Sequence, residues 1–438
     1  MKRAWQNLAY RGRFISEIHL LPIKINNNKQ MKRIFNTVML FIFLFSIIKV
    51  DAQQTIEGIN YATGNPIKVT IKDGKISKIK SIKKLSDENN DVFISQGFID
   101  NQVNGFAGVS FSFGGSNLTQ EGIEKATSEL WKKGVTTYLP TLTTNSQELL
   151  INNFTVLSGS VDNKKLLGSI PGFHLEGPYI NPEDGFRGAH PKRFVRLPDW
   201  NEFMKFYKAS GENILQVSVA PEMEGCQDFI KKCTEKGIVV SLAHHNSNTE
   251  QVNLAVANGA KTSTHLGNGC ANMINRHRNP LWPQLANDDL TITIICDGFH
   301  LLPEEIQVFY KVKGVDKTII TSDVTSYAAL EPGEYKTQTG EIIELTKEGM
   351  LRYPAQNVLY GSASAITKGV GHIMKVTGCS LADAVQMAST NSAKLYGLTD
   401  RGTMEIGKRA DLILFTLDSF NVNIKKTFVK GELVYSAE

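Results

Sequence analysis

The sequence lacks the features that mark several large classes of protein. Its five cysteines are scattered and show neither zinc-finger spacing nor a dense disulfide framework. No block of Lys and Arg is interleaved with aromatic residues, and the net charge is only +5 over 438 residues, so nucleic-acid binding is not expected. A Gly-rich phosphate loop is also missing after the first strand-like run, which counts against an open, doubly wound sheet.

Long apolar runs are scarce, and the one that stands out lies near the N-terminus. Met31-Lys32-Arg33 supplies a basic start, residues 38–48 are almost wholly apolar, and Val50-Asp51-Ala52 offers a cleavage site. Because the apolar core is too short to span a membrane comfortably, we predict a signal peptide over residues 31–52. Residues 1–30 would then be a non-native extension. Export to the periplasm is expected, or a cytoplasmic location if the signal is not used, with no membrane span in the mature chain.

The apolar pattern over the rest of the chain predicts an α/β fold. Eight strand-like runs alternate with helical patterns, such as the one over residues 121–133 with Ile123, Ala126 and Leu130 on one face. The runs cover residues 92–99, 135–139, 166–175, 215–220, 238–243, 261–264, 291–296 and 318–322. Eight βα units predict a (β/α)8 barrel over residues 96–400, with the active site at the C-terminal ends of the strands.

Both ends of this region are rich in strand patterns. An Asp73-Gly74 turn and a Lys430-Gly431 turn each join two alternating segments, which predicts one hairpin near each terminus. We therefore expect residues 53–95 and 401–438 to form one small β-sandwich domain.

Histidine and acidic residues are placed where the predicted strands end. The chain has nine histidines, and five of them are His174, His244, His245, His265 and His300, at or just after these strand ends. Glu176 follows the third run, and Asp323 follows the eighth. A lone histidine at such a place is usually structural. A Glu with two His, however, makes a three-ligand set for Zn²⁺ or a similar ion, and Asp323 could then act as a general acid and base.

Five motifs together resemble N-acetylglucosamine-6-phosphate deacetylases of the amidohydrolase superfamily, over residues 54–438. They are residues 97–105 (Gly-Phe-Ile-Asp-Asn-Gln-Val-Asn-Gly), 174–178 (His-Leu-Glu-Gly-Pro), 264–268 (Thr-His-Leu-Gly-Asn), 297–300 (Asp-Gly-Phe-His) and 321–323 (Thr-Ser-Asp). The resemblance implies Glu176, His245 and His265 as metal ligands, with His245 preferred over His244. It also implies Asp323 as the catalytic acid and base.

The resemblance further implies how the substrate is held. His190 would hold the substrate carbonyl and act with Asp323 in catalysis. The expected substrate-binding residues are Gln102, Asn104, Ala189, Asn268, Gly269, Arg276 and His300, with Arg278 as an alternative to Arg276 for the phosphate. Gln102 and Asn104 stand where most amidohydrolases carry His-x-His. This favours one divalent ion, Zn²⁺ first, with Fe²⁺ or another ion as the alternative.

The expected activity is removal of acetate from N-acetylglucosamine 6-phosphate, a small-molecule substrate. A homodimer is expected from the resemblance. Two alternatives remain: a deacylase of an unphosphorylated N-acetyl amino sugar or of another N-acyl compound, and a degenerate, non-catalytic binding barrel.

Overall fold

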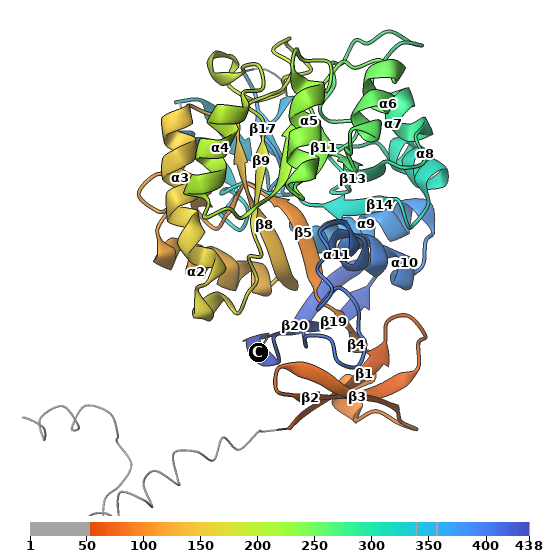
Figure 1. Cartoon of the computed structure of the whole chain (residues 1–438). Coiled ribbons are helices and arrows are strands. Elements are labelled where there is room, and N and C mark those ends of the chain that lie inside the picture. Colours follow the sequence, from red (N-terminus) through yellow and green to blue (C-terminus); the bar gives the residue numbers. More distant parts are fainter. Residues whose placement is uncertain (1–52, 339, 356–357, 438) are drawn as a thin grey trace, which may run out of the picture. The chain divides into compact units, whose positions relative to one another are not determined.

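The computed structural model describes residues 53–338, 340–355 and 358–437. The predicted N-terminal extension and signal peptide (residues 1–52) lie outside the described residues. Figure 1 shows a helix-covered barrel and, next to it, a sheet built from both ends of the described chain. Among the described residues, none of the helices combines the length and the apolar character that crossing a membrane requires.

Eight parallel strands form the barrel, in the order β14-β13-β12-β11-β10-β9-β8-β5. At the seam, Val103 pairs with Val324, just beyond β14, and the amide of Asn104 donates to the carbonyl of Val324 over 2.7 Å. The predicted barrel is confirmed. Its strands are β5 (Phe98–Val103), β8 (Val135–Thr143), β9 (Phe173–Glu176), β10 (Ile214–Val219), β11 (Val239–Leu242), β12 (Thr262–Ser263), β13 (Thr291–Ile295) and β14 (Thr318–Thr321).

Helices cover the outside of the barrel (Figure 1). The predicted helix near residue 121 is α2, which begins after Thr119, whose side chain accepts a hydrogen bond from the amide of Gly122. Its predicted apolar face is buried against the barrel. The helices are α2 (Gln120–Trp131), α3 (Gln147–Val161), α4 (Trp200–Ala209), α5 (Cys226–Glu235), α6 (Thr249–Ala257), α7 (Leu281–Ala286), α8 (Pro303–Lys313), α9 (Ile366–Thr377), α10 (Leu381–Val385) and α11 (Asn391–Leu395), with a π-helical turn, η4 (Gln386–Thr390), between the last two.

Strands from both termini form one seven-stranded sheet, in the order β21-β20-β19-β4-β1-β2-β3. The two ends of the chain meet where β4 pairs antiparallel with β19, with Ile94 opposite Leu414. Both side chains are buried in a small apolar core of this sheet, so the prediction of one β-domain from both termini is confirmed. The strands are β1 (Gln54–Asn60), β2 (Pro66–Lys72), β3 (Lys75–Ser81), β4 (Phe93–Gln96), β19 (Leu412–Asp418), β20 (Asn421–Val429) and β21 (Glu432–Ser436).

Gly97 divides the first predicted strand-like run (residues 92–99) between the two sheets. Its amide donates to the carbonyl of Asp411 near the terminal sheet, and the next amide, of Phe98, donates to Gly134 at the start of the barrel strand β8. A Cβ atom on Gly97 would lie 2.2 Å from the side chain of Thr136. Only glycine therefore allows β8 to approach this closely where the chain changes sheets.

A small sheet between β14 and α9 was not predicted from the sequence. We call these four antiparallel strands the insert sheet: β15 (Gly333–Lys336), β16 (Ile342–Leu345), β17 (Leu351–Tyr353) and β18 (Val358–Leu359). It has an apolar cluster of its own, formed by Ile343, Leu345 and Leu351 with several tyrosines around them. A short hairpin, β6 (Gly105–Phe106) with β7 (Val109–Ser110), follows β5.

Candidate active site

A cavity of about 580 Å³ opens at the C-terminal ends of the barrel strands. Loops after β5, β9, β11, β12, β13 and β14 contribute to its wall, as expected for an active site in this architecture. The insert sheet adds Thr337, Leu359 and neighbouring residues. The predicted site residues on the wall are Asn104, Glu176, Ala189, His190, His265, Asn268, His300 and Asp323.

Glu176, His244 and His265 form a compact cluster in this cavity. Oε1 of Glu176 lies 2.8 Å from Nε2 of His265 and 3.5 Å from Nε2 of His244. One nitrogen or oxygen atom from each residue lies within 4.8 Å of the others, and all three side chains are buried. One carboxylate and two imidazoles are a ligand set that suits a divalent transition metal ion.

The hydrogen bonds around the cluster are consistent with metal binding. Nδ1 of His244 lies 2.8 Å from the carbonyl oxygen of Phe186. Since a carbonyl only accepts, Nδ1 carries a proton, and in the tautomer without hydrogen on Nε2 the lone pair of that nitrogen faces the cluster. Nδ1 of His265 is buried without a hydrogen-bond partner among the described residues.

Charge is concentrated within the cluster. Burial alone would raise the pKa of Glu176, but its close contacts with the rings of His244 and His265 hold that pKa well below its usual range. Burial alone would lower the pKa of His265, but the hydrogen bond to Glu176 outweighs it and raises that pKa overall. The carboxylate is therefore ionised, as a metal ligand must be.

The structure places His244, and not the predicted ligand His245, beside Glu176 and His265. The ring of His245 lines a separate small cavity with Gln284, and its Nδ1 accepts from the amide of Ser247 over 3.2 Å. The physical reason is the backbone of His244, whose φ of 48° interrupts the alternation of the strand. The side chain of His244, and not that of its neighbour, therefore faces Glu176.

Asp323 lies on the cavity wall after β14. Its Oδ1 accepts hydrogen bonds from Nδ2 of Asn104 over 2.7 Å and from Nε2 of Gln102 over 2.9 Å. Burial and the nearby charge of Glu176 raise the pKa of Asp323 to about 6. A carboxyl group with a pKa near neutrality can both accept and return a proton.

His190 stands beside the metal set. Its Nε2 lies 3.2 Å from Nε2 of His244, and its Nδ1 lies 2.8 Å from Oγ1 of Thr144. Burial and the proximity of His244 lower the pKa of His190 to about 3. The ring that His190 presents to the cavity is therefore neutral. The sequence analysis identified His190 but missed its partner Thr144, because Thr144 lies in none of the five motifs.

His300 is oriented by Asp297. Nδ1 of His300 lies 2.8 Å from Oδ2 of Asp297, whose Oδ1 accepts from the amides of Phe299 and His300. Burial would raise the pKa of Asp297, but these contacts with His300 and the backbone lower it to about 2. The ionised carboxylate holds the proton on Nδ1 of His300, and the same ring lies on the cavity wall.

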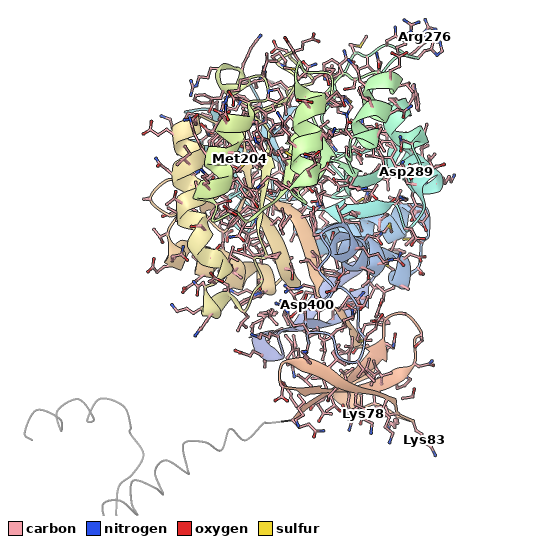
Figure 2. All side chains as sticks on the ribbon, viewed as in Figure 1. Lys78, Lys83, Met204, Arg276, Asp289 and Asp400 are labelled. Carbon is pink, nitrogen blue, oxygen red and sulfur yellow. The ribbon has the colours of Figure 1, made fainter. Side chains whose placement is uncertain are left out.

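Besides His245, four sequence-predicted residues do not lie on the wall of the cavity: Gln102, Gly269, Arg276 and Arg278. Gln102 donates to Asp323 without lining the cavity. Gly269 packs against His244, and a Cβ atom on Gly269 would lie 2.9 Å from the backbone nitrogen of His244. Arg276 and Arg278 are exposed. Figure 2 shows Arg276 at the outer edge of the molecule, at the end opposite to Lys78.

Arg187 is the arginine that lines the cavity, and sequence reasoning missed it. Its guanidinium donates to the carbonyls of Gly188 and His190 and forms an ion pair with Asp184. Arg187 could have been found from the sequence by its position three residues before His190, in the same loop. These contacts hold the loop that carries His190 and Ala189.

The barrel, the cluster of one carboxylate and two imidazoles that could hold a metal ion, and the separate Asp323 together resemble the active site of a hydrolase. The chain belongs to the amidohydrolase family, whose sequence profile matches residues 93–434. It is 32% identical over 390 residues to the N-acetylglucosamine-6-phosphate deacetylase of Caenorhabditis elegans, a match that covers 84% of this chain and 91% of that protein. It is 28% identical over 379 residues to the deacetylase of the same name from Bacillus subtilis (84% of this chain, 92% of that protein).

Solved structures agree with the sequence relatives. The N-acetylglucosamine-6-phosphate deacetylase of Thermotoga maritima superposes with a TM-score of 0.76 at 27% identity, covering 88% of this chain and 100% of that one. The enzyme of the same name from Pasteurella multocida gives 0.77 at 26% identity, with the same coverage. The resemblance to N-acetylglucosamine-6-phosphate deacetylases that the motifs indicate is thus confirmed.

Proposed function

We propose that the chain hydrolyses the N-acetyl amide of N-acetylglucosamine 6-phosphate to acetate and glucosamine 6-phosphate. The observation that carries this proposal is the convergence of Glu176, His244 and His265 with Asp323 in one cavity. Relatives that bear the name of this deacetylase support the choice of substrate.

The proposed cofactor is one divalent ion, with Zn²⁺ as the expected metal. Glu176, His244 and His265 would hold it, and the free lone pair of His244 and the ionised Glu176 fit that role. The ion would lower the pKa of a water molecule and polarise the amide carbonyl. Gln102 and Asn104, where other members would carry His-x-His, bind Asp323 instead, which favours a single ion.

The chain's own residues supply the proton transfers. Oδ1 of Asp323 is engaged by two amide donors, so Oδ2 takes the proton of the attacking water and returns it to the leaving nitrogen. In the tautomer with hydrogen on Nε2, His190 donates to the acetyl carbonyl oxygen and stabilises the charge that develops there. Ala189, Asn268 and His300 bind the sugar from the wall of the cavity.

Arg276 is exposed and lies outside the cavity of its own chain, so the phosphate contact assigned to it would come from a second copy of the chain. We therefore propose a homodimer in which the loop carrying Arg276 and Arg278 reaches the partner's cavity. Arg276→Ala would then raise KM for the phosphorylated sugar at least tenfold, since a charge-assisted hydrogen bond contributes about 1.5–3 kcal/mol. An equal effect on the unphosphorylated sugar would remove this assignment.

We also propose that residues 31–52 act as an export signal, on the basis of their sequence alone. Amino-terminal sequencing of the mature protein tests this, and a start at or before Met31 would contradict it. An exported enzyme meets sugars outside the cytoplasm, which is the reason to keep unphosphorylated N-acetylglucosamine as a second candidate substrate.

The deciding experiment compares turnover of N-acetylglucosamine 6-phosphate and N-acetylglucosamine by purified protein with quantified metal. We expect a clear preference for the phosphorylated sugar in kcat/KM, and loss of turnover after chelation with recovery on adding Zn²⁺. Preference for the free sugar would move the assignment to the second candidate. Tight binding of both sugars without acetate release would instead indicate a non-catalytic barrel.

A further inference from the structure

We infer that Asp100, Gln102 and Asn104 form a row of positioning residues that fixes the carboxylate of Asp323. The inference rests on the proposed function, in which Asp323 transfers the proton. The three residues are every second residue at the end of β5 and beyond it. Each of them hydrogen-bonds to the segment 321–323, across the seam where the barrel closes.

Asp100 holds the backbone that leads into Asp323. Its Oδ1 accepts from the amide of Ser322 over 3.1 Å and from the hydroxyl of Thr321 over 3.2 Å. Asp323 itself has a φ of 53°, a left-handed conformation that a non-glycine residue keeps only when its surroundings impose it. The contacts of Asp100 are one part of those surroundings.

Gln102 and Asn104 hold the side chain. Both amides donate to the same oxygen, Oδ1, over 2.9 Å and 2.7 Å. Two donors on one oxygen fix the rotation of the carboxylate, and leave Oδ2 as the oxygen that is free to exchange a proton. The residue type is also explained, because an amide can donate to an ionised carboxylate, whereas a carboxylate at either position would repel it.

Backbone pairing at this seam is sparse. Among the described residues, one parallel bridge links Val103 with Val324, and the amide of Asn104 donates to the carbonyl of Val324 as part of it. The other neighbouring barrel strands pair over two to four residues. The row of side chains therefore replaces the missing ladder at the place where Asp323 must be held.

Gln102 is the best residue for a test, because it contacts Asp323 without lining the cavity. Gln102→Met keeps the length of the side chain and removes the donor. In the full-length, metal-loaded protein we expect kcat to fall at least tenfold with KM within about twofold. The acid limb of the kcat profile should move up by about one pH unit, because a hydrogen bond that favours the ionised form of Asp323 is lost.

A matched control separates positioning from general loss of packing. Gln216 is another buried glutamine of the barrel, bonded to His174 and to the hydroxyl of Tyr396, with no hydrogen bond to Asp323 among the described contacts. Gln216→Met should leave the acid limb in place even if it lowers the melting temperature. Metal content is measured for both variants and should equal that of the wild type.

A double-mutant cycle adds a second readout. If Gln102 acts through Asp323, Gln102→Met in an Asp323→Asn background should change the residual rate by less than about twofold. An unchanged kcat and acid limb for Gln102→Met, with an active wild type, would overturn the inference. A wild type inactive on every N-acetyl amino sugar would instead overturn the proposed function, so the two failures are distinguishable.

Discussion

Three residues of the candidate site stand on left-handed backbone. His244, His265 and Asp323 have φ values of 48°, 32° and 53°, and each follows the C-terminal end of a barrel strand. Such conformations cost about 1–3 kcal/mol for a residue other than glycine. The turn changes which side of the strand the side chain faces, and it is this change that brings these side chains into one cavity.

Exchange of the histidine proposed to bind the metal is the first prediction at this scale. His244→Ala should remove stoichiometric metal from the purified protein, because Nε2 of His244 is the atom that faces Glu176. His245→Ala should retain the metal, and it is the matched control because it is the next residue in the chain and is equally buried. Metal analysis after dialysis decides between them, and a reversed result would restore the sequence-based assignment to His245.

The acid and base role of Asp323 gives a second prediction. Asp323→Asn should keep the metal and lower kcat by at least a hundredfold, since proton transfer contributes about 10²–10⁴-fold. In the wild type, the pKa of Asp323 is raised to about 6, and the base must be ionised to act. The rate should therefore fall as the pH drops through about 6. Flat kcat between pH 5 and pH 8 would contradict this role.

The residues that sequence patterns located well are those at the ends of regular strands. Glu176 and Asp323 follow directly from the end of an apolar run. The choice between His244 and His245 could not be made this way, because an alternating pattern assumes extended backbone and His244 departs from it. The contact of Gln102 with Asp323 was also beyond reach, since the two residues are 221 positions apart in the chain.

At the scale of elements, the junction between the two sheets is the feature that the sequence did not reveal. An apolar run shows that a strand is present, but it does not show where the strand changes partners. The change occurs at Gly97, where the close approach of Thr136 excludes a side chain. The insert sheet was missed for a similar reason, because its short strands carry little periodicity of their own.

Gly97 provides the element-scale prediction. Gly97→Val places a branched side chain within 2.2 Å of Thr136, so β5 and β8 must move apart. We expect a loss of about 2–4 kcal/mol in the free energy of unfolding, measured by denaturant titration. Gly159→Val is a control, because Gly159 is exposed, has no positive φ, and a Cβ atom there would meet only the end of the Gln120 side chain. Equal losses for both variants would show that the close approach is unimportant.

At the scale of the whole molecule, the terminal sheet and the barrel are joined by buried polar contacts as well as by the chain itself. Arg409 forms a buried ion pair with Asp411 and also donates to the carbonyls of Leu167 and Gly168, which precede β9. The hydroxyl of Thr427 donates to the carbonyl of Trp131 at the end of α2. These contacts cross from the terminal sheet to the barrel, so the two are expected to unfold together.

Arg409→Met tests this coupling. The change leaves the carboxylate of Asp411 buried without its partner, so we expect a loss of about 3–5 kcal/mol in the free energy of unfolding. Lys232→Met, which removes an exposed ion pair with Asp228, should change it by less than about 1 kcal/mol. Calorimetry should show one cooperative transition for the wild type. Two separate transitions would contradict the coupling.

The insert sheet has a consequence for how related proteins diversify. Its apolar cluster is distinct from that of the barrel, while Thr337 and Leu359 face the substrate cavity. Mutations in the strands of this sheet are therefore expected to alter the wall of the cavity more than the core of the barrel. Evolution of activity toward a different acylated sugar would be expected to begin with substitutions in the insert sheet, while the residues proposed to carry out hydrolysis stay the same.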